Sequence, residues 1–177
     1  EVLLSLGAKT PRFLITDDAP NFKGHVKSHQ LCWIHEIRKY KLTEVYKRIE
    51  SKTLNLILKR WRYFYHLMNE YLKNPTLEKK ERIIKEFESI TKIKTLVKPI
   101  DLQLERTRKN RKLLLLFLRY PHIPIENNMA ERDLRERVIK RKISLQNRSK
   151  KGLDAWDLML SLASTCRKLS ISFWDYL

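Results

Sequence analysis

Strand-like segments occur only near the start of this chain of 177 residues, and this restriction most limits the folds open to it. A short apolar run at 12–16, bounded by turn-forming residues, predicts a buried strand, and the run at 30–34 predicts a second. Beyond Glu36 the apolar residues recur with helical spacing, which predicts helices at about 36–71, 77–93, 101–118 and 153–169. The predicted fold class is therefore α/β and mostly helical, with few short strands.

The charge balance indicates the kind of partner. Lys and Arg number 38 against 20 Asp and Glu, which gives a formal net charge of +18. Such an excess favours a polyanionic partner, with nucleic acid ahead of a membrane surface. The alternative is a surface charge that serves solubility alone. Because 42% of the residues are hydrophobic, the chain has enough apolar material for a core and is not a disordered polycation.

The cysteines and the apolar runs bear on the compartment. Cys32 and Cys166 are far apart and lack the spacing of a disulfide framework, so we expect a reducing, cytoplasmic setting. The longest apolar run, Leu113–Leu118, is far shorter than the about 20 residues that cross a bilayer. No membrane association and no signal peptide are predicted. The chain begins with Glu1 in the middle of an apolar pattern, which suggests a piece of a longer protein.

Two acidic residues follow the first predicted strand. Asp17 and Asp18 stand where a carboxylate projects from the carboxyl end of a strand, the usual ligand position in open α/β sheets. Oxygen ligands of this kind suit divalent cations such as Mg²⁺. The alternative is an Asp that stabilises a turn, which is common.

A further acidic residue lies in a basic segment that reads NNMAERDLR. Asn128 and Glu131 have the spacing of a capping box, and Glu131 and Arg135 that of a helix ion pair. Glu131 also adjoins an apolar stripe formed by Ala130, Leu134 and Val138, where a carboxylate needs a partner. Arginines or a metal ion would serve, and the spacing does not choose between them.

Basic residues dominate the segment from Arg132 to Lys151, with nine Lys or Arg against two acidic residues. Basic side chains interspersed with Ser and Asn are typical of phosphate contacts, so we predict a nucleic-acid interface here. Its candidate residues are Arg132, Arg135, Arg141, Lys142 and Arg148.

The Cys32-x-x-His35 pair, preceded by His25 and His29, has the residue types of a zinc site. The spacing is irregular, and two of the four side chains fall in a predicted polar loop. We favour a packed cysteine with hydrogen-bonded histidines over a structural zinc.

Taken together, several motifs resemble a known family. They are FLITDDAPNF, LCWIHEIRKY, YPHIPIENNMAERDLRERVIKRKIS, the pair Lys151-Gly152 and the terminal SFWDYL. In this order they resemble the catalytic region of DDE transposases from bacterial and archaeal insertion sequences, over nearly the whole chain. The resemblance implies an RNase H-like core, at 1–36 and 120–177, that is interrupted by an all-helical insertion at 37–119. Such an insertion would occupy most of the 113 residues between Asp17 and Glu131.

The resemblance also implies an activity and roles for these residues. Members of the family use three carboxylates to hold two Mg²⁺ or Mn²⁺ ions, which promote cleavage and strand transfer of DNA. By position, Asp17 (with Asp18 as the fallback) and Glu131 match two of the three, with Cys32, His35 and Asn128 in supporting roles. The basic residues named above would hold DNA phosphates. A homodimer in the DNA complex is a further implication.

The first Asp of the family set has no counterpart from Glu1 onward, so we expect an N-terminally truncated catalytic core that is inactive by itself. The alternative is a non-catalytic, basic helical protein, or a repurposed remnant of a transposase, that binds DNA or RNA. In that case Asp17 and Glu131 would not share a metal ion.

Overall fold

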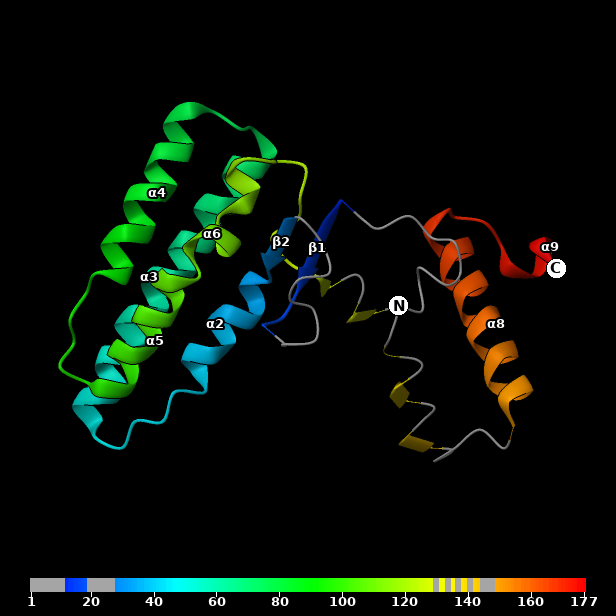
Figure 1. Ribbon diagram of the computed structural model, residues 1–177, viewed down its shortest axis with the longest axis horizontal. Coiled ribbons are helices and arrows are strands. Elements are labelled where there is room, and N and C mark those ends of the chain that lie inside the picture. Colours follow the sequence, from blue (N-terminus) through cyan, green and yellow to red (C-terminus); the bar gives the residue numbers. More distant parts are fainter. Residues whose placement is uncertain are drawn as a thin grey trace. The chain divides into compact units, whose positions relative to one another are not determined.

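The chain divides into two units in this computed structural model, residues 1–127 and residues 128–177 (Figure 1). The structure describes residues 12–18, 28–128, 131–132, 135, 138–139, 142–143 and 149–177.

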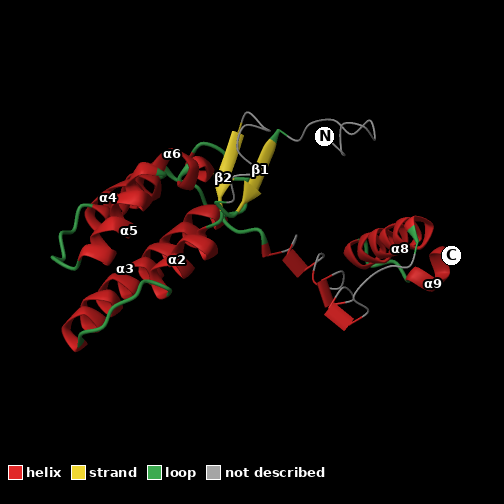
Figure 2. Ribbon diagram, turned by 60° about the horizontal axis from the view of Figure 1, so that its bottom comes forward, coloured by secondary structure: helices red, strands yellow, loops and turns green. Residues whose placement is uncertain are grey.

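A pair of parallel strands lies in the first unit, where Figure 2 shows them side by side. Strand β1 (Phe13–Thr16) pairs with strand β2 (Ser28–Leu31), in a register that sets Thr16 opposite Leu31. The amide of Cys32 donates to the carbonyl oxygen of Thr16 at 2.8 Å and extends the pairing by one residue. Because the strands are parallel, the residues that follow them leave from the same edge of the sheet.

Helices form most of the rest of the described part of this unit (Figure 1). Helix α2 (Trp33–Lys41) begins directly after β2, and the long helix α3 (Arg48–Lys73) carries an apolar stripe at i, i+3, i+4 and i+7. They are followed by α4 (Leu77–Thr91), α5 (Lys98–Lys109), the short α6 (Arg111–Leu114) and the 3₁₀ helix η2 (Leu116–Leu118). Local signals fix some ends, since the Thr76 side chain caps α4 and a proline lies in the first turn of α5.

An aromatic cluster forms the centre of the hydrophobic core. Trp33, Trp61, Phe64 and Phe87 are completely buried. The Trp33 ring lies 5.0 Å from that of Phe64 and 5.6 Å from that of Trp61, centroid to centroid, in tilted arrangements that aromatic pairs favour. Burial of each such side chain away from water stabilises the folded state by roughly 1.5–3 kcal/mol. Because Trp33 is the first residue of α2, this cluster ties the strand edge to the helices.

The connector at residues 120–127 is fixed to the strands and to α3. The amide of Trp33 donates to the carbonyl of Ile125 at 2.9 Å, and the Gln30 side chain donates to the carbonyl of Pro124 at 2.7 Å. The Tyr65 hydroxyl donates to the Glu126 carboxylate at 2.7 Å. These bonds hold the chain up to Glu126, close to the end of the first unit.

The second unit contains helix α8 (Lys150–Lys168) and the short helix α9 (Phe173–Tyr176). The Ser149 hydroxyl caps α8 by accepting from the amide of Gly152. The described residues between 128 and 143 are helical. Within the described parts of the chain, no helix has the length and apolar character needed to cross a membrane.

The predicted fold class is confirmed, as is a strand that ends at Thr16. The strand predicted at 30–34 was wrong in its extent, because Trp33 and Ile34 begin α2, where the indole of Trp33 enters the aromatic cluster. The helix predicted at 36–71 is interrupted at 42–47, and that predicted at 101–118 breaks after Lys109. The division into a core and an insertion at 37–119 stays a prediction.

Candidate functional site

Two carboxylates stand at the carboxyl end of β1, as the sequence predicted. Asp17 and Asp18 follow the strand directly and are half-buried. On one side, the Thr16 hydroxyl donates to the carbonyl oxygen of Asp17 at 2.5 Å and lies 2.7 Å from Nε2 of His29 on β2. On the other side, Oδ2 of Asp18 accepts from the ammonium of Lys39 at 3.2 Å. Both flanks of Asp17 are thus held by side chains from other parts of the fold.

The Lys39 ammonium links this edge to a buried carboxylate. It lies 3.1 Å from Oε2 of Glu36, whose side chain is only 1% exposed. Burial by itself lowers the pKa of Lys39, but the two carboxylates outweigh it, and the net effect is a pKa above the ordinary value. Lys39 therefore remains charged and is shared between Asp18 and Glu36.

Helix α5 supplies the neutral hydrogen-bond partners of Glu36. The Thr107 hydroxyl donates to Oε1 of Glu36 at 2.5 Å, and the amide of Gln103 donates to the same oxygen at 3.2 Å. The Tyr40 hydroxyl lies 2.6 Å from that of Thr107. A continuous polar network therefore runs from the end of β1 through α2 to α5. It lies beside the aromatic core, which Tyr40 contacts through Trp61.

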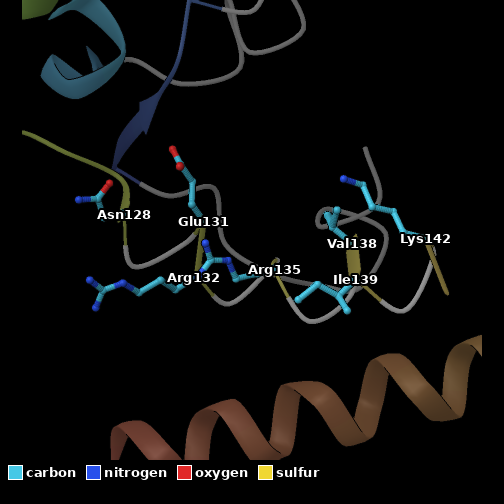
Figure 3. A pocket seen from close by; sticks show the side chains of 7 residues that line it. All are labelled: Asn128, Glu131, Arg132, Arg135, Val138, Ile139 and Lys142. Atoms are coloured by element: carbon cyan, nitrogen blue, oxygen red, sulfur yellow. The ribbon is translucent and has the colours of Figure 1, made fainter. Parts of the chain in front are cut away.

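The second unit presents a basic hollow around Glu131, of about 720 Å³. Figure 3 shows the described side chains that line it, with Glu131 and Arg132 pointing in different directions. The cationic and acidic side chains are solvent-exposed, as are the two apolar ones. The lining residues are Asn128, Glu131, Arg132, Arg135, Val138, Ile139 and Lys142.

Comparison with known proteins assigns the chain to a family. The pattern of the "Transposase IS66 family" matches residues 13–155, which include both the strand-end carboxylates and the basic hollow. The chain belongs to the IS66 transposase family. The uncharacterized protein y4jO of Sinorhizobium fredii is 35% identical over 168 residues, which are 93% of this IS66-family chain and 50% of the relative. The chain thus spans about half the length of that curated relative. No solved structure matches it.

The supporting residues predicted for this IS66-family chain lie next to the strand edge. Cys32 is buried between β2 and α2, and its amide bonds to Thr16. His35 lies in the first turn of α2, 3.4 Å from the guanidinium of Arg38. Their supporting role stays a prediction.

The predicted metal and DNA ligands of the IS66-family chain are divided between the units. Asp17 belongs to the first unit, and Glu131, Arg132, Arg135 and Lys142 to the second, so a meeting of Asp17 with Glu131 stays a prediction. Arg141 and Arg148 lie outside the described residues. Within the described residues, no three His, Cys, Asp or Glu side chains are grouped so that they would hold a metal ion.

The roles of Lys39 and Glu36 were not predicted from the sequence. Glu36 lies three residues after Trp33 and four before Tyr40, and all three are buried. That spacing was the available signal, since a carboxylate on the inner stripe of a helix requires partners. The partners on α5 had no signal in the sequence, because contacts between distant helices depend on tertiary packing.

Proposed function

We propose that this IS66-family chain contributes catalytic carboxylates to a DNA transposase, which performs metal-dependent phosphodiester cleavage and strand transfer. The observation that carries the proposal is the position of Asp17, at the carboxyl end of a parallel strand and inside the segment that matches the family. In this proposal Asp17 and Glu131 share divalent metal ions, and the basic side chains of the second unit hold DNA.

The donor chemistry at the strand edge fits a hard divalent cation. Carboxylate oxygens are the ligands that Mg²⁺ and Mn²⁺ prefer. The position of Asp17 directly after β1 supports it as the ligand, and the ion pair of Asp18 with Lys39 supports a different role for Asp18. When bound, two such ions supply positive charge that activates the attacking hydroxyl or water and stabilises the departing oxygen.

The length of the chain between the two acids is compatible with a shared site. Ile125 is bonded to the backbone of Trp33, which adjoins the strand edge. Six residues lead from Ile125 to Glu131, a length of chain that spans at most about 22 Å when it is fully extended. The 113 intervening residues of sequence therefore do not require a large separation in space.

The exposed basic side chains have a separate task in this proposal. Arg132, Arg135 and Lys142 offer cationic donors that neutralise phosphates and orient a DNA strand beside Glu131. Arginine suits this task because its planar guanidinium bonds two phosphate oxygens at once. Binding of this kind weakens as salt increases, since each neutralised phosphate contributes about −0.9 to the slope of log affinity against log salt concentration.

Metal-dependent stability provides the test. Thermal unfolding of the 177-residue chain is measured with increasing Mn²⁺ for the wild type, Asp17→Asn and Glu131→Gln. The matched control is Glu81→Gln, which changes an exposed carboxylate on α4. We expect Mn²⁺ at a hundredfold excess over its Kd to stabilise the wild type and the control by about 2.7 kcal/mol. Either site substitution should remove this increment.

Equal metal stabilisation in all four proteins contradicts the proposal. Retained DNA binding with a steep salt dependence would then favour the alternative function, a basic protein that binds nucleic acid without cutting it. A flat salt response would count against DNA as the partner.

A further inference from the structure

Glu36 is a buried carboxylate, only 1% exposed, that is not one of the proposed metal ligands. It is linked through Lys39 to Asp18 at the carboxyl end of β1. Taking such a charge out of water is costly unless an opposite charge and hydrogen bonds compensate it. Thr107 and Gln103 supply the hydrogen bonds, and within the described residues Lys39 supplies the opposite charge.

The need to compensate Glu36 fixes the position of Lys39. A lysine side chain in solution samples many rotamers, and holding it still costs conformational entropy. Here the ammonium lies 3.1 Å from Glu36 and 3.2 Å from Asp18. The backbone of α2, from which Lys39 projects, is itself anchored by the buried Trp33 and Tyr40. Asp18 is therefore bound to a cation whose place is set by the helical part of the fold.

The backbone on both sides of Asp17 is consequently anchored. Asp18 is tied to Lys39, and the preceding backbone is tied through the Thr16 hydroxyl to the carbonyl of Asp17. The backbone of Asp17 thus lies between two fixed points. A metal ligand needs such support, because its carboxylate must keep one orientation as the ion binds.

We propose that Lys39 is a positioning residue, held by the buried Glu36, which fixes Asp18 so that the neighbouring Asp17 presents its carboxylate to a divalent cation. This inference rests on the proposed function. It assigns Asp18 an anchoring role in place of a metal-binding one, and it makes α5, through Thr107, part of the support of the site.

The test measures the Mn²⁺ affinity of the 177-residue chain from the spectroscopic signal of free Mn²⁺, with thermal unfolding in parallel. Lys39→Met removes the ammonium but leaves Glu36 uncompensated, which would destabilise the fold. The double variant Glu36→Gln with Lys39→Met avoids this problem, since a glutamine still accepts from Thr107. The control is Lys41→Met, which changes an exposed lysine on the same helix.

We expect the double variant to keep nearly the wild-type melting temperature and to bind Mn²⁺ about 10–100-fold more weakly, the usual effect of losing a residue that supports a metal ligand. Asp18→Asn should weaken binding to a similar extent, and Asp17→Asn should abolish it. Lys39→Arg should restore most of the affinity, because it keeps a cation between the two carboxylates. Lys41→Met should bind as the wild type does.

Wild-type affinity in the double variant, or a Lys39→Arg variant that binds as weakly as the double variant, overturns the inference. The proposed function survives either result if Asp17→Asn still abolishes binding. Wild-type affinity in Asp17→Asn refutes the proposed function itself and the inference with it. The Asp17→Asn variant thus distinguishes failure of the inference about Lys39 from failure of the proposed function.

Discussion

Removal of a single hydroxyl, by Tyr65→Phe, tests how the segment that leads to Glu131 is held. The Tyr65 hydroxyl donates to the Glu126 carboxylate at 2.7 Å, and both side chains are half-buried. A hydrogen bond to a charged group contributes about 1.5–3 kcal/mol. Because water reaches both groups and replaces part of that energy, we expect a loss of about 1–2 kcal/mol in the free energy of unfolding. For a chain of this size the melting temperature should fall by roughly 2–4 °C per kcal/mol.

The same bond has a signature in the pH dependence. Burial, followed by the hydrogen bond to Glu126, raises the pKa of Tyr65 to about 12. Since the pKa is raised on folding, the stabilisation is complete below the unfolded-state value of about 10 and is lost as the pH rises towards 12. The difference in unfolding free energy between wild type and Tyr65→Phe should therefore be constant near neutral pH and shrink above pH 10.

Urea unfolding followed by circular dichroism, at pH 7, 9 and 10.5, measures this difference. The control is Tyr63→Phe on the same helix, where the hydroxyl bonds to the exposed Arg82. We expect the control substitution to lower the free energy of unfolding by less than about 0.5 kcal/mol. Equal losses in the two variants, or a difference for Tyr65→Phe that does not change above pH 10, would refute the reasoning.

Two further predictions concern the DNA surface and the core. Arg132→Gln and Arg135→Gln should each make the slope of log DNA affinity against log salt shallower by about 0.9, measured by fluorescence anisotropy, if each contacts one phosphate; an unchanged slope would exclude that contact. Phe87→Ala should reduce the free energy of unfolding by about 3–5 kcal/mol in urea melts, because this ring is completely buried in the aromatic cluster. The exposed Leu77→Ala should change it by no more than about 0.5 kcal/mol, and a comparable loss there would contradict the assignment of the core.

Most of the helical fold was predictable because its apolar stripes are long. The helix at 77–93 was expected within two residues of the observed α4, where Thr76 supplies a capping signal. The break at 42–47 was not predictable in the same way, since it contains neither Gly nor Pro. The local signal for a new helix start after the break is Glu50, whose carboxylate accepts from the amides of Tyr46 and Lys47 at the start of α3.

The sequence predicted the candidate site only in part, for a physical reason. A strand followed directly by Asp17 is a local pattern, and the parallel pairing of β1 with β2 bears out the place of Asp17 at the carboxyl edge of the sheet. The role of Lys39 depends on α2 packing against α5, which is a tertiary contact between residues that are distant in sequence. Local patterns identify which residues carry chemistry, whereas packing determines which of them are held in place.

We propose that Asp17 and Glu131 share a cation, and iron-directed cleavage tests this sharing directly. Fe²⁺ in place of Mg²⁺, with ascorbate and peroxide, generates radicals that cut the polypeptide close to the bound ion. If the cation is shared, we expect cuts near both residue 17 and residue 131, and the loss of both cuts in Asp17→Asn and equally in Glu131→Gln. Cuts near one residue alone, or variants that each lose only their own cut, would contradict it.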